Sequence, residues 1–207
     1  VCRHETDRKQ VPACHIFTPL CIDCNMETTI HIKELMMLSI HDFHYSSDAP
    51  YPPIKAESGN PAYARVMLDN IGGSNSEMSA ISLYVFNQLI TGYNPDVSAV
   101  FHKVSIVEMH HLEIFGKLAQ QLGEEPRLWT QHGCKKIYWS PSYNQYPGEL
   151  RTLMRNVIDG EKAAISKYQH QISYIRDENI TENLRRIILD ERLHVEIFEK
   201  VYGAYCS

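Results

Sequence analysis

Two copies of one short pattern place the same chemical groups in the same relation. Glu108 and His111 are matched 83 residues later by Glu191 and His194, and both copies read Glu-x-x-His-x-Glu-Ile-Phe-x-Lys. A glutamate and a histidine three residues apart point the same way from a helix. Each copy therefore offers one carboxylate and one imidazole on one helix face, and both groups are ligands of transition metals.

Two further glutamates repeat at almost the same period. Glu77 and Glu161 are 84 residues apart, and each is followed seven residues later by a tyrosine, Tyr84 or Tyr168. All four glutamates interrupt stripes of otherwise apolar residues at helical spacing. Burying an unpaired carboxylate is costly, so four of them in a bundle core need cations. The alternative is that they are exposed glutamates that fall in register by chance.

Two divalent metal ions would balance the four carboxylates. Oxygen ligands with one imidazole per metal suit iron or manganese better than zinc with its tetrahedral preference. We therefore expect two bridging glutamates, two terminal glutamates and one histidine per metal. The bridging pair is Glu108 and Glu191, the terminal pair is Glu77 and Glu161, and the histidines are His111 and His194.

The elements that must position these groups are helices. Apolar residues at three- and four-residue spacing predict four of them. Gly72 and Gly73 are expected to kink or split the first helix. No stretch shows convincing strand alternation. The predicted helices cover residues 62–90, 96–122, 147–176 and 182–202.

Loop lengths predict how these helices connect. Short turns join the first helix to the second and the third to the fourth, whereas the connection 123–146 is long enough to cross a bundle. Residues 61–207 are thus predicted to form an all-α four-helix bundle of two antiparallel helical hairpins joined by a long crossover. Residues 1–60 are rich in Cys, His, Thr and Pro and are predicted to form an irregular N-terminal arm.

Composition excludes several classes of partner. A net charge of -5 without a basic stripe argues against nucleic acid. No apolar run approaches the roughly 18 residues of a membrane span. Four of the six cysteines lie within the first 24 residues and form no disulfide framework for the bundle. With no secretory signal pattern in view, we expect a cytoplasmic protein.

The duplicated ligand pattern resembles that of the ferritin-like di-metal carboxylate superfamily. In that superfamily two helices each supply one Glu and the other two each supply Glu-x-x-His, so the agreement is a match to a known pattern. The likeness covers about residues 62–202. The phrases SEMSAISLY and IILDERLHVEIF look most like the rubrerythrin-like and manganese-catalase-like proteins of bacteria. A full rubrerythrin has two Cys-x-x-Cys pairs, whereas this chain has one, Cys21 and Cys24.

The resemblance implies an oxidoreductase that acts on hydrogen peroxide at two iron or manganese ions per chain. Manganese would favour disproportionation, and iron would favour reduction with an external electron donor. The candidate catalytic residues are Glu108, Glu191, Tyr84 and Tyr168. The tyrosines are expected to hydrogen-bond the ligand carboxylates or to act in electron transfer, with core packing as the alternative.

Two other functions fit the same ligand set. One is ferritin-like oxidation and storage of iron, which requires a large multi-subunit shell. The other is an oxygen-activating di-iron hydroxylase, which uses dioxygen and requires a channel for its substrate. In each case we expect a homo-oligomer that binds a small-molecule substrate.

Overall fold

The computed structural model describes residues 43–133 and 135–206. The Cys-rich part of the predicted arm, residues 1–42, and Cys134 lie outside the described residues. Between α4 and α5 lie strands β1 (Trp129–His132) and β2 (Lys135–Tyr138) and the 3₁₀ turn η1 (Pro141–Tyr143). The helices are α2 (Pro61–Gly72), α3 (Glu77–Ile90), α4 (Pro95–Gln121), α5 (Leu150–Tyr174) and α6 (Glu178–Tyr205).

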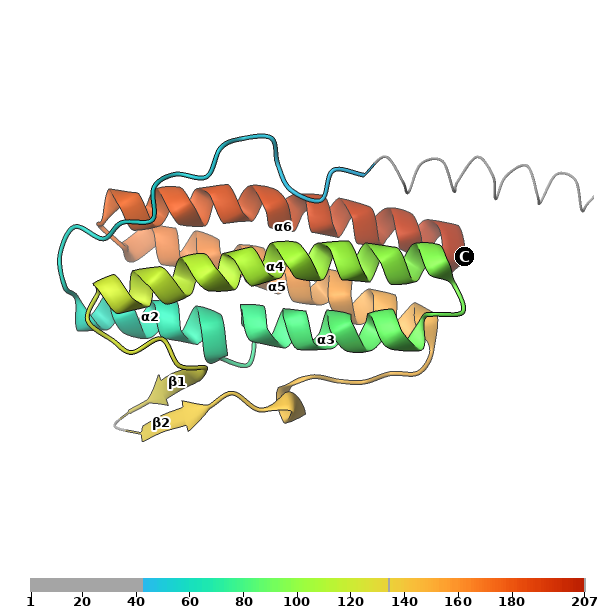
Figure 1. Ribbon diagram of the computed structural model, residues 1–207, viewed down its shortest axis with the longest axis horizontal. Coiled ribbons are helices and arrows are strands. Elements are labelled where there is room, and N and C mark those ends of the chain that lie inside the picture. The colour runs from blue at the N-terminus through green and yellow to red at the C-terminus, as the bar shows by residue number, and fades with distance from the viewer. Residues whose placement is uncertain (1–42, 134, 207) are drawn as a thin grey trace, which may run out of the picture. The chain divides into compact units, whose positions relative to one another are not determined.

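The predicted all-α bundle is confirmed, with its first helix in two pieces. Helices α2 and α3 follow one another along α4, and α5 packs against α6 (Figure 1). The long crossover from α4 to α5 joins these two antiparallel hairpins. Within the part of the chain that the structure describes, no helix is long and apolar enough to cross a membrane.

Side chains at the helix starts explain where the helices begin. Asn60, Ser76 and Asn94 each accept a hydrogen bond from a first-turn backbone N–H of α2, α3 and α4. The fourth predicted helix begins at Glu178 and not at residue 182, because Asp177 caps it in the same way. The third predicted helix begins at Leu150 and not at residue 147, because the side chain of Glu149 caps it.

Gly72 ends α2 because the crossover backbone lies against it. A Cβ atom on Gly72 would lie 2.4 Å from the backbone nitrogen of Trp129 and 2.7 Å from the carbonyl carbon of Leu128. The hydroxyl of Thr130 donates to Asp69 Oδ1 at 2.8 Å, which ties α2 to β1. The predicted kink or split at Gly72 and Gly73 is therefore a split, and α3 restarts after Ser76.

The expectation that the chain contains no strand is wrong. Strands β1 and β2 form an antiparallel hairpin in which Trp129 faces Tyr138. Gly133 has a φ of +59°, which suits the tight turn between them. The amino group of Lys136 lies 3.9 Å from the centre of the Trp129 ring. Strands of four residues are too short to show alternation, and all of β2 is exposed.

The apolar core divides into two clusters with polar residues between them. One cluster joins α2 to the second half of α4 and includes Phe115. The other joins α3 to the first half of α4 and includes Phe101 and Phe198. Tyr168 belongs to the first cluster and Tyr84 to the second. The glutamates and histidines predicted from the sequence occupy the space between these clusters.

Residues 43–60, which we call the strap, contain no helix or strand and run along α6 and α4 (Figure 1). Asn183 Nδ2 of α6 donates to the carbonyl of Pro53 at 3.2 Å, and the backbone N–H of Glu57 donates to Asp177 at 2.7 Å. Gln121 Nε2 of α4 donates to the carbonyl of Ile54 at 3.0 Å. The division between arm and bundle at residue 60 stays a prediction.

Candidate metal centre

All six predicted metal ligands lie in the bundle core. None of their side chains is more than 3% exposed. Each of the helices α3, α4, α5 and α6 contributes at least one of them. Glu77 begins α3, Glu108 and His111 lie on α4, Glu161 lies on α5, and Glu191 and His194 lie on α6.

The six side chains form two overlapping groups of four. The first group adds Glu77 and His111 to a shared pair, and the second adds Glu161 and His194 to the same pair. The shared pair is Glu108 and Glu191. Within each group the potential ligand atoms lie within 4.8 Å of one another. Two cations could therefore be held side by side, with two carboxylates reaching both.

Both imidazoles turn the same nitrogen towards the centre. His111 Nδ1 lies 3.0 Å from Glu108 Oε2 and 3.3 Å from Glu191 Oε1. His194 Nδ1 lies 2.9 Å from Glu108 Oε1 and 3.1 Å from Glu191 Oε2. Each histidine thus faces both of the shared carboxylates.

The outer nitrogens of both imidazoles have hydrogen-bond partners. His111 Nε2 lies 3.0 Å from Asp190 Oδ2, and His194 Nε2 lies 2.9 Å from the backbone oxygen of Tyr45. A carboxylate and a carbonyl only accept hydrogen bonds, so Nε2 donates in both rings. A bound metal ion would take the place of the proton on Nδ1, and the Nε2–H group would then keep the ring in the orientation that a metal ligand needs.

Asp190 contacts a residue of the candidate site and was missed by the sequence reasoning. Its carboxylate is buried and also accepts hydrogen bonds from Arg186 Nη1 at 2.7 Å, from the backbone N–H of Ser47 at 2.7 Å and from the hydroxyl of Tyr51. Burial alone would raise the pKa of Asp190, but the hydrogen bonds from His111, Tyr51 and Arg186 outweigh it and lower the pKa. Asp190 therefore stays ionised behind His111.

A local signal could have found Asp190. Arg186 and Asp190 are four residues apart on α6, on a face that a helical plot places towards the core. A charged pair in that position indicates a buried ion pair. The strap residues that contact Asp190 are more than 130 residues away in the chain and leave no such signal.

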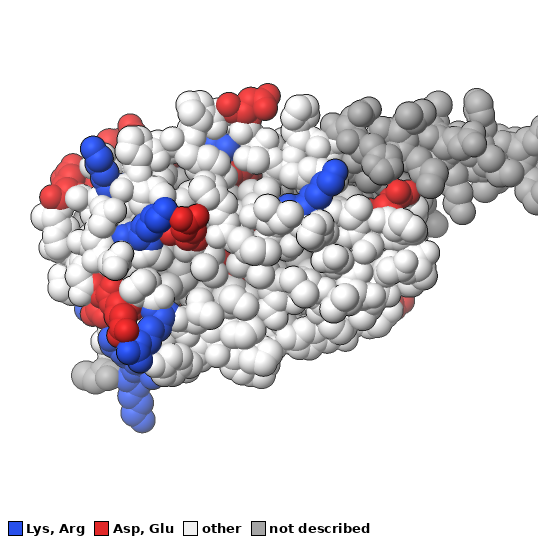
Figure 2. Space-filling model, viewed as in Figure 1, with Lys and Arg blue, Asp and Glu red and all other residues white. Residues whose placement is uncertain are grey.

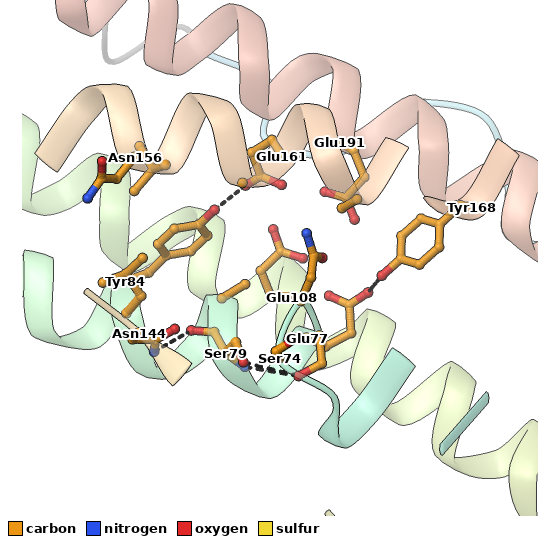
Figure 3. Close-up of a pocket in the computed structure, with 17 residues that line it drawn as sticks. Ser74, Glu77, Ser79, Tyr84, Glu108, Asn144, Asn156, Glu161, Tyr168 and Glu191 are labelled. Carbon is orange, nitrogen blue, oxygen red and sulfur yellow. Dashed lines mark hydrogen bonds between the residues drawn. The ribbon is translucent and has the colours of Figure 1, made fainter. Parts of the chain in front are cut away.

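Tyr84 and Tyr168 hydrogen-bond the outer glutamates of the opposite hairpin. The hydroxyl of Tyr84 on α3 donates to Glu161 on α5, and the hydroxyl of Tyr168 on α5 donates to Glu77 on α3 (Figure 3). Both tyrosines are at most 2% exposed. Each phenol holds one oxygen of its carboxylate, and for Glu77 the other oxygen, Oε2, lies 3.9 Å from His111 Nδ1.

Crowding of buried carboxylates dominates the electrostatics. Burial raises the pKa of Glu77 and Glu161 well above the ordinary value, and the negative charges of Glu108 and Glu191 raise it further. Burial also opposes ionisation of Glu108, but the neighbouring imidazoles outweigh it and lower the pKa of that carboxyl. The outer pair of glutamates thus tends to hold protons when no cation is bound.

The same buried carboxylates favour the protonated, positively charged form of the two histidines. Burial alone would lower the pKa of His111 and His194, because it disfavours the charged ring. The surrounding carboxylates outweigh burial, and the pKa of both imidazoles is raised well above the ordinary value. Positive charge is therefore strongly favoured at this place in the core.

The donor set fits two divalent transition-metal ions. Four carboxylates and two Nδ1 atoms converge, and Glu108 Oε1 is buried without a well-aligned hydrogen bond from any described residue, although His194 Nδ1 lies 2.9 Å away. Oxygen-rich ligation with one imidazole per ion matches iron or manganese. Glu108 and Glu191 are placed to reach both ions, and the other four residues to reach one ion each.

A cavity of about 120 Å³ opens onto one side of the centre. Its lining includes all four glutamates and both tyrosines but neither histidine. Asn144 of the crossover and Asn156 of α5 line it further out and are partly exposed (Figure 3). A small polar molecule could therefore reach the carboxylate side of the centre, whereas the strap covers the histidine side.

Comparison with known proteins found a matching family and proteins of similar fold. The family model for rubrerythrin matches residues 73–202. A probable manganese catalase from Clostridium acetobutylicum is 20% identical over 165 residues, covering 71% of this chain and 73% of that protein. The crystal structure of KatB, a manganese catalase from Anabaena PCC7120, has a TM-score of 0.70 at 23% identity and covers 80% of this chain and 81% of KatB. A structure of wild-type KatB has a TM-score of 0.67 at 23% identity, covering 78% of this chain and 80% of that chain.

Proposed function

The chain belongs to the rubrerythrin family, and on that premise we propose that it is an oxidoreductase that acts on hydrogen peroxide at two iron or manganese ions. The observation that carries the proposal is the pair of ligand groups that share Glu108 and Glu191. Two bound metal ions would supply the two-electron change that cleavage of the O–O bond requires.

The protein's own residues would hold and orient this centre. The phenols of Tyr84 and Tyr168 fix the carboxylates of Glu161 and Glu77, so each of these glutamates keeps one oxygen free for a metal. Asp190 fixes the ring of His111. The two apolar clusters on either side exclude bulk water and favour a site whose charges compensate one another.

The size of the cavity favours peroxide over an organic substrate. Pockets that bind organic ligands are commonly about 300–1,000 Å³, whereas the space beside the glutamates is about 120 Å³. Hydrogen peroxide, with two oxygens that donate and accept hydrogen bonds, suits a small space lined by carboxylate, phenol and amide groups. This observation supports peroxide chemistry over the hydroxylase alternative.

We further propose disproportionation at manganese as the reaction. The support is that the relative from Clostridium acetobutylicum and the Anabaena protein KatB are both described as manganese catalases. Peroxide reduction at iron, with an external electron donor, is the second candidate, and the support for it is the match to the rubrerythrin family. The two reactions differ in one product, because only disproportionation releases oxygen.

An oxygen electrode tests this proposal. Protein loaded with manganese should release one oxygen molecule for every two molecules of hydrogen peroxide consumed. The variant E108A/E191A removes both shared carboxylates and should lose this activity together with the bound metal. The matched control E113A/E196A removes the corresponding exposed glutamates of the same repeated pattern and should keep it. Peroxide consumption that needs an added reductant and releases no oxygen would favour the iron reaction instead.

Two other expectations stay predictions. One is a cytoplasmic location. The other is a homo-oligomer, and exposed apolar side chains support it: Leu89 of α3 is 72% exposed and Tyr93 just after α3 is 74% exposed. Figure 2 shows that charged side chains gather at the left end of the viewed face and are few near α3.

A further inference from the structure

We infer that the strap is a working part of the metal centre, and that Arg186 is the positioning residue that holds it there. This inference rests on the proposed function, because it concerns the same two metal ions. It adds a part of the chain outside the matched family domain, which begins at residue 73. The observation behind it is that strap residues contact or support the outer nitrogens of both ligand histidines.

The strap reaches each histidine by a different route. The backbone oxygen of Tyr45 lies 2.9 Å from His194 Nε2 and is the direct partner of that ring. The hydroxyl of Tyr51 lies 3.4 Å from His111 Nε2 and donates to Asp190, which is the direct partner of the other ring. The strap thereby supports the Nε2–H tautomer of both imidazoles.

Arg186 binds this part of the strap with three of its five N–H donors. Its Nε donates to the carbonyl of Ala49 at 2.6 Å, and its Nη2 donates to the carbonyl of Ser47 at 2.7 Å and to the hydroxyl of Ser46 at 3.2 Å. Its Nη1 donates to Asp190 at 2.7 Å. The guanidinium also lies 3.9 Å from the centre of the Tyr51 ring.

A lysine cannot replace these contacts. Arg186 is only 5% exposed, so its planar fork is enclosed by the strap on one side and Asp190 on the other. A lysine ammonium is a compact point charge that reaches one or two of these acceptors and leaves the rest without a donor. The R186K variant should therefore release the strap while keeping a positive charge at the same place in α6.

Binding of Mn²⁺ to the full-length chain, followed by the paramagnetic resonance signal of free Mn²⁺, tests the inference. We expect R186K to lower the affinity for both Mn²⁺ ions about 10-fold or more, which is the range seen when a ligand histidine loses its outer partner. The control R185K changes the neighbouring arginine, which is exposed and pairs with Glu178. It should leave both affinities within about 2-fold of the wild-type values.

The Y51F variant separates positioning from general loss of stability. It removes only the hydroxyl that supports Asp190 and His111, and does not touch the backbone oxygen that binds His194. We expect the affinity for one of the two Mn²⁺ ions to fall several-fold and the affinity for the other to stay unchanged. A general destabilisation would lower both affinities. Tyr93, which is exposed, supplies the control variant Y93F.

Hydrogen exchange completes the test. The backbone N–H of Ser47, which donates to Asp190, should exchange faster in R186K than in R185K. If R186K exposes this amide, and if R186K and Y51F both bind two Mn²⁺ ions as tightly as the wild type does, the inference is wrong. If R186K does not fold, Y51F decides the question alone. Wild-type protein that binds two ions without acting on peroxide would overturn the proposed function and leave this inference standing.

Discussion

The six inner residues of the centre obey a pseudo-twofold relation that their outer partners break. His111 hydrogen-bonds a carboxylate, Asp190, whereas His194 hydrogen-bonds a neutral backbone carbonyl. The residue that corresponds to Asp190 in the first copy of the pattern, 83 positions earlier, is Val107, whose side chain cannot accept a hydrogen bond. An anionic partner makes an imidazole the stronger electron donor. The two metal positions are therefore chemically different although their direct ligands match.

Protonation of the same residues predicts how stability depends on pH. The pKa values of Glu77, Glu161 and both ligand histidines are raised in the folded protein. Groups with raised pKa values stabilise the fold below their unfolded values, about 4.3 for Glu and 6.5 for His. That stabilisation is lost as pH rises through the folded values. Metal-free protein should thus become less stable as pH rises above about 6.5, where both kinds of group lose this stabilisation.

Metal should remove this dependence, because two divalent ions compensate the carboxylates once the protons have left. Thermal unfolding of metal-free and manganese-loaded protein across this pH range measures the effect. The difference between the two melting temperatures should widen as pH rises. Metal-free protein whose melting temperature rises steadily with pH would contradict this account of the cluster. Asp190 does not enter this range, since its pKa is lowered and it would lose stabilisation only in acid.

At this scale the sequence predicts which glutamates and histidines lie together in the core, because repetition and apolar surroundings set them apart. Glu77, Glu108, Glu161 and Glu191 all fall where the stripes place them. The outer partners were missed for a physical reason. Tyr45 acts through its backbone oxygen, which every residue has, and Tyr51 meets Asp190 only because the strap folds back across the bundle.

Among the elements, the break between α2 and α3 has the most direct bearing on the centre. Glu77 is the first residue of α3, and Ser76 caps that helix. The break therefore determines the position of the Glu77 carboxylate. The break exists because the crossover backbone at Trp129 occupies the space beside Gly72. The small hairpin of β1 and β2 thus helps to position a residue of the core.

Substitution of Gly72 tests this coupling. In G72A the new Cβ would meet backbone atoms at 2.4 to 2.7 Å, which side-chain rotation cannot relieve. We expect the free energy of unfolding to fall by about 1 to 3 kcal/mol, as in other overpacked cores. Thermal or urea unfolding of the metal-free protein measures it.

The control for this substitution is G116A in the middle of α4. Its new Cβ would meet only Pro126 Cβ at 3.8 Å, an ordinary contact. A glycine in a helix interior costs about 0.5 to 1 kcal/mol relative to alanine, so this variant should gain stability. If G72A were as stable as wild type, the crossover would not hold the end of α2 in place.

Helix identity was predictable because long amphipathic stripes carry a strong signal, but the starts of α5 and α6 were not. Asp177 and Glu149 cap their helices with side chains that the apolar pattern does not include. The hairpin was missed because four-residue strands with exposed faces have no periodicity to detect. Its stabilising contacts, such as Lys136 on Trp129, form only after the two strands pair.

Across the molecule, two copies of one helical hairpin enclose a centre that neither could form alone. Each hairpin supplies two glutamates, one histidine and the tyrosine that holds a carboxylate of the other hairpin. The cavity approaches this centre from the carboxylate side, and the strap covers the histidine side. The whole arrangement therefore separates the route of a small substrate from the contacts that orient the imidazoles.

Anomalous diffraction from crystals of the manganese-loaded full-length chain, recorded at the manganese absorption edge, tests the central claim most directly. We predict two peaks per chain about 3.5 to 4 Å apart, the usual spacing of paired metals. Glu108 and Glu191 should lie between the two peaks, with His111 Nδ1 beside one and His194 Nδ1 beside the other. A single peak, or peaks that avoid these four side chains, would contradict the claim that this bundle is built around two metal ions.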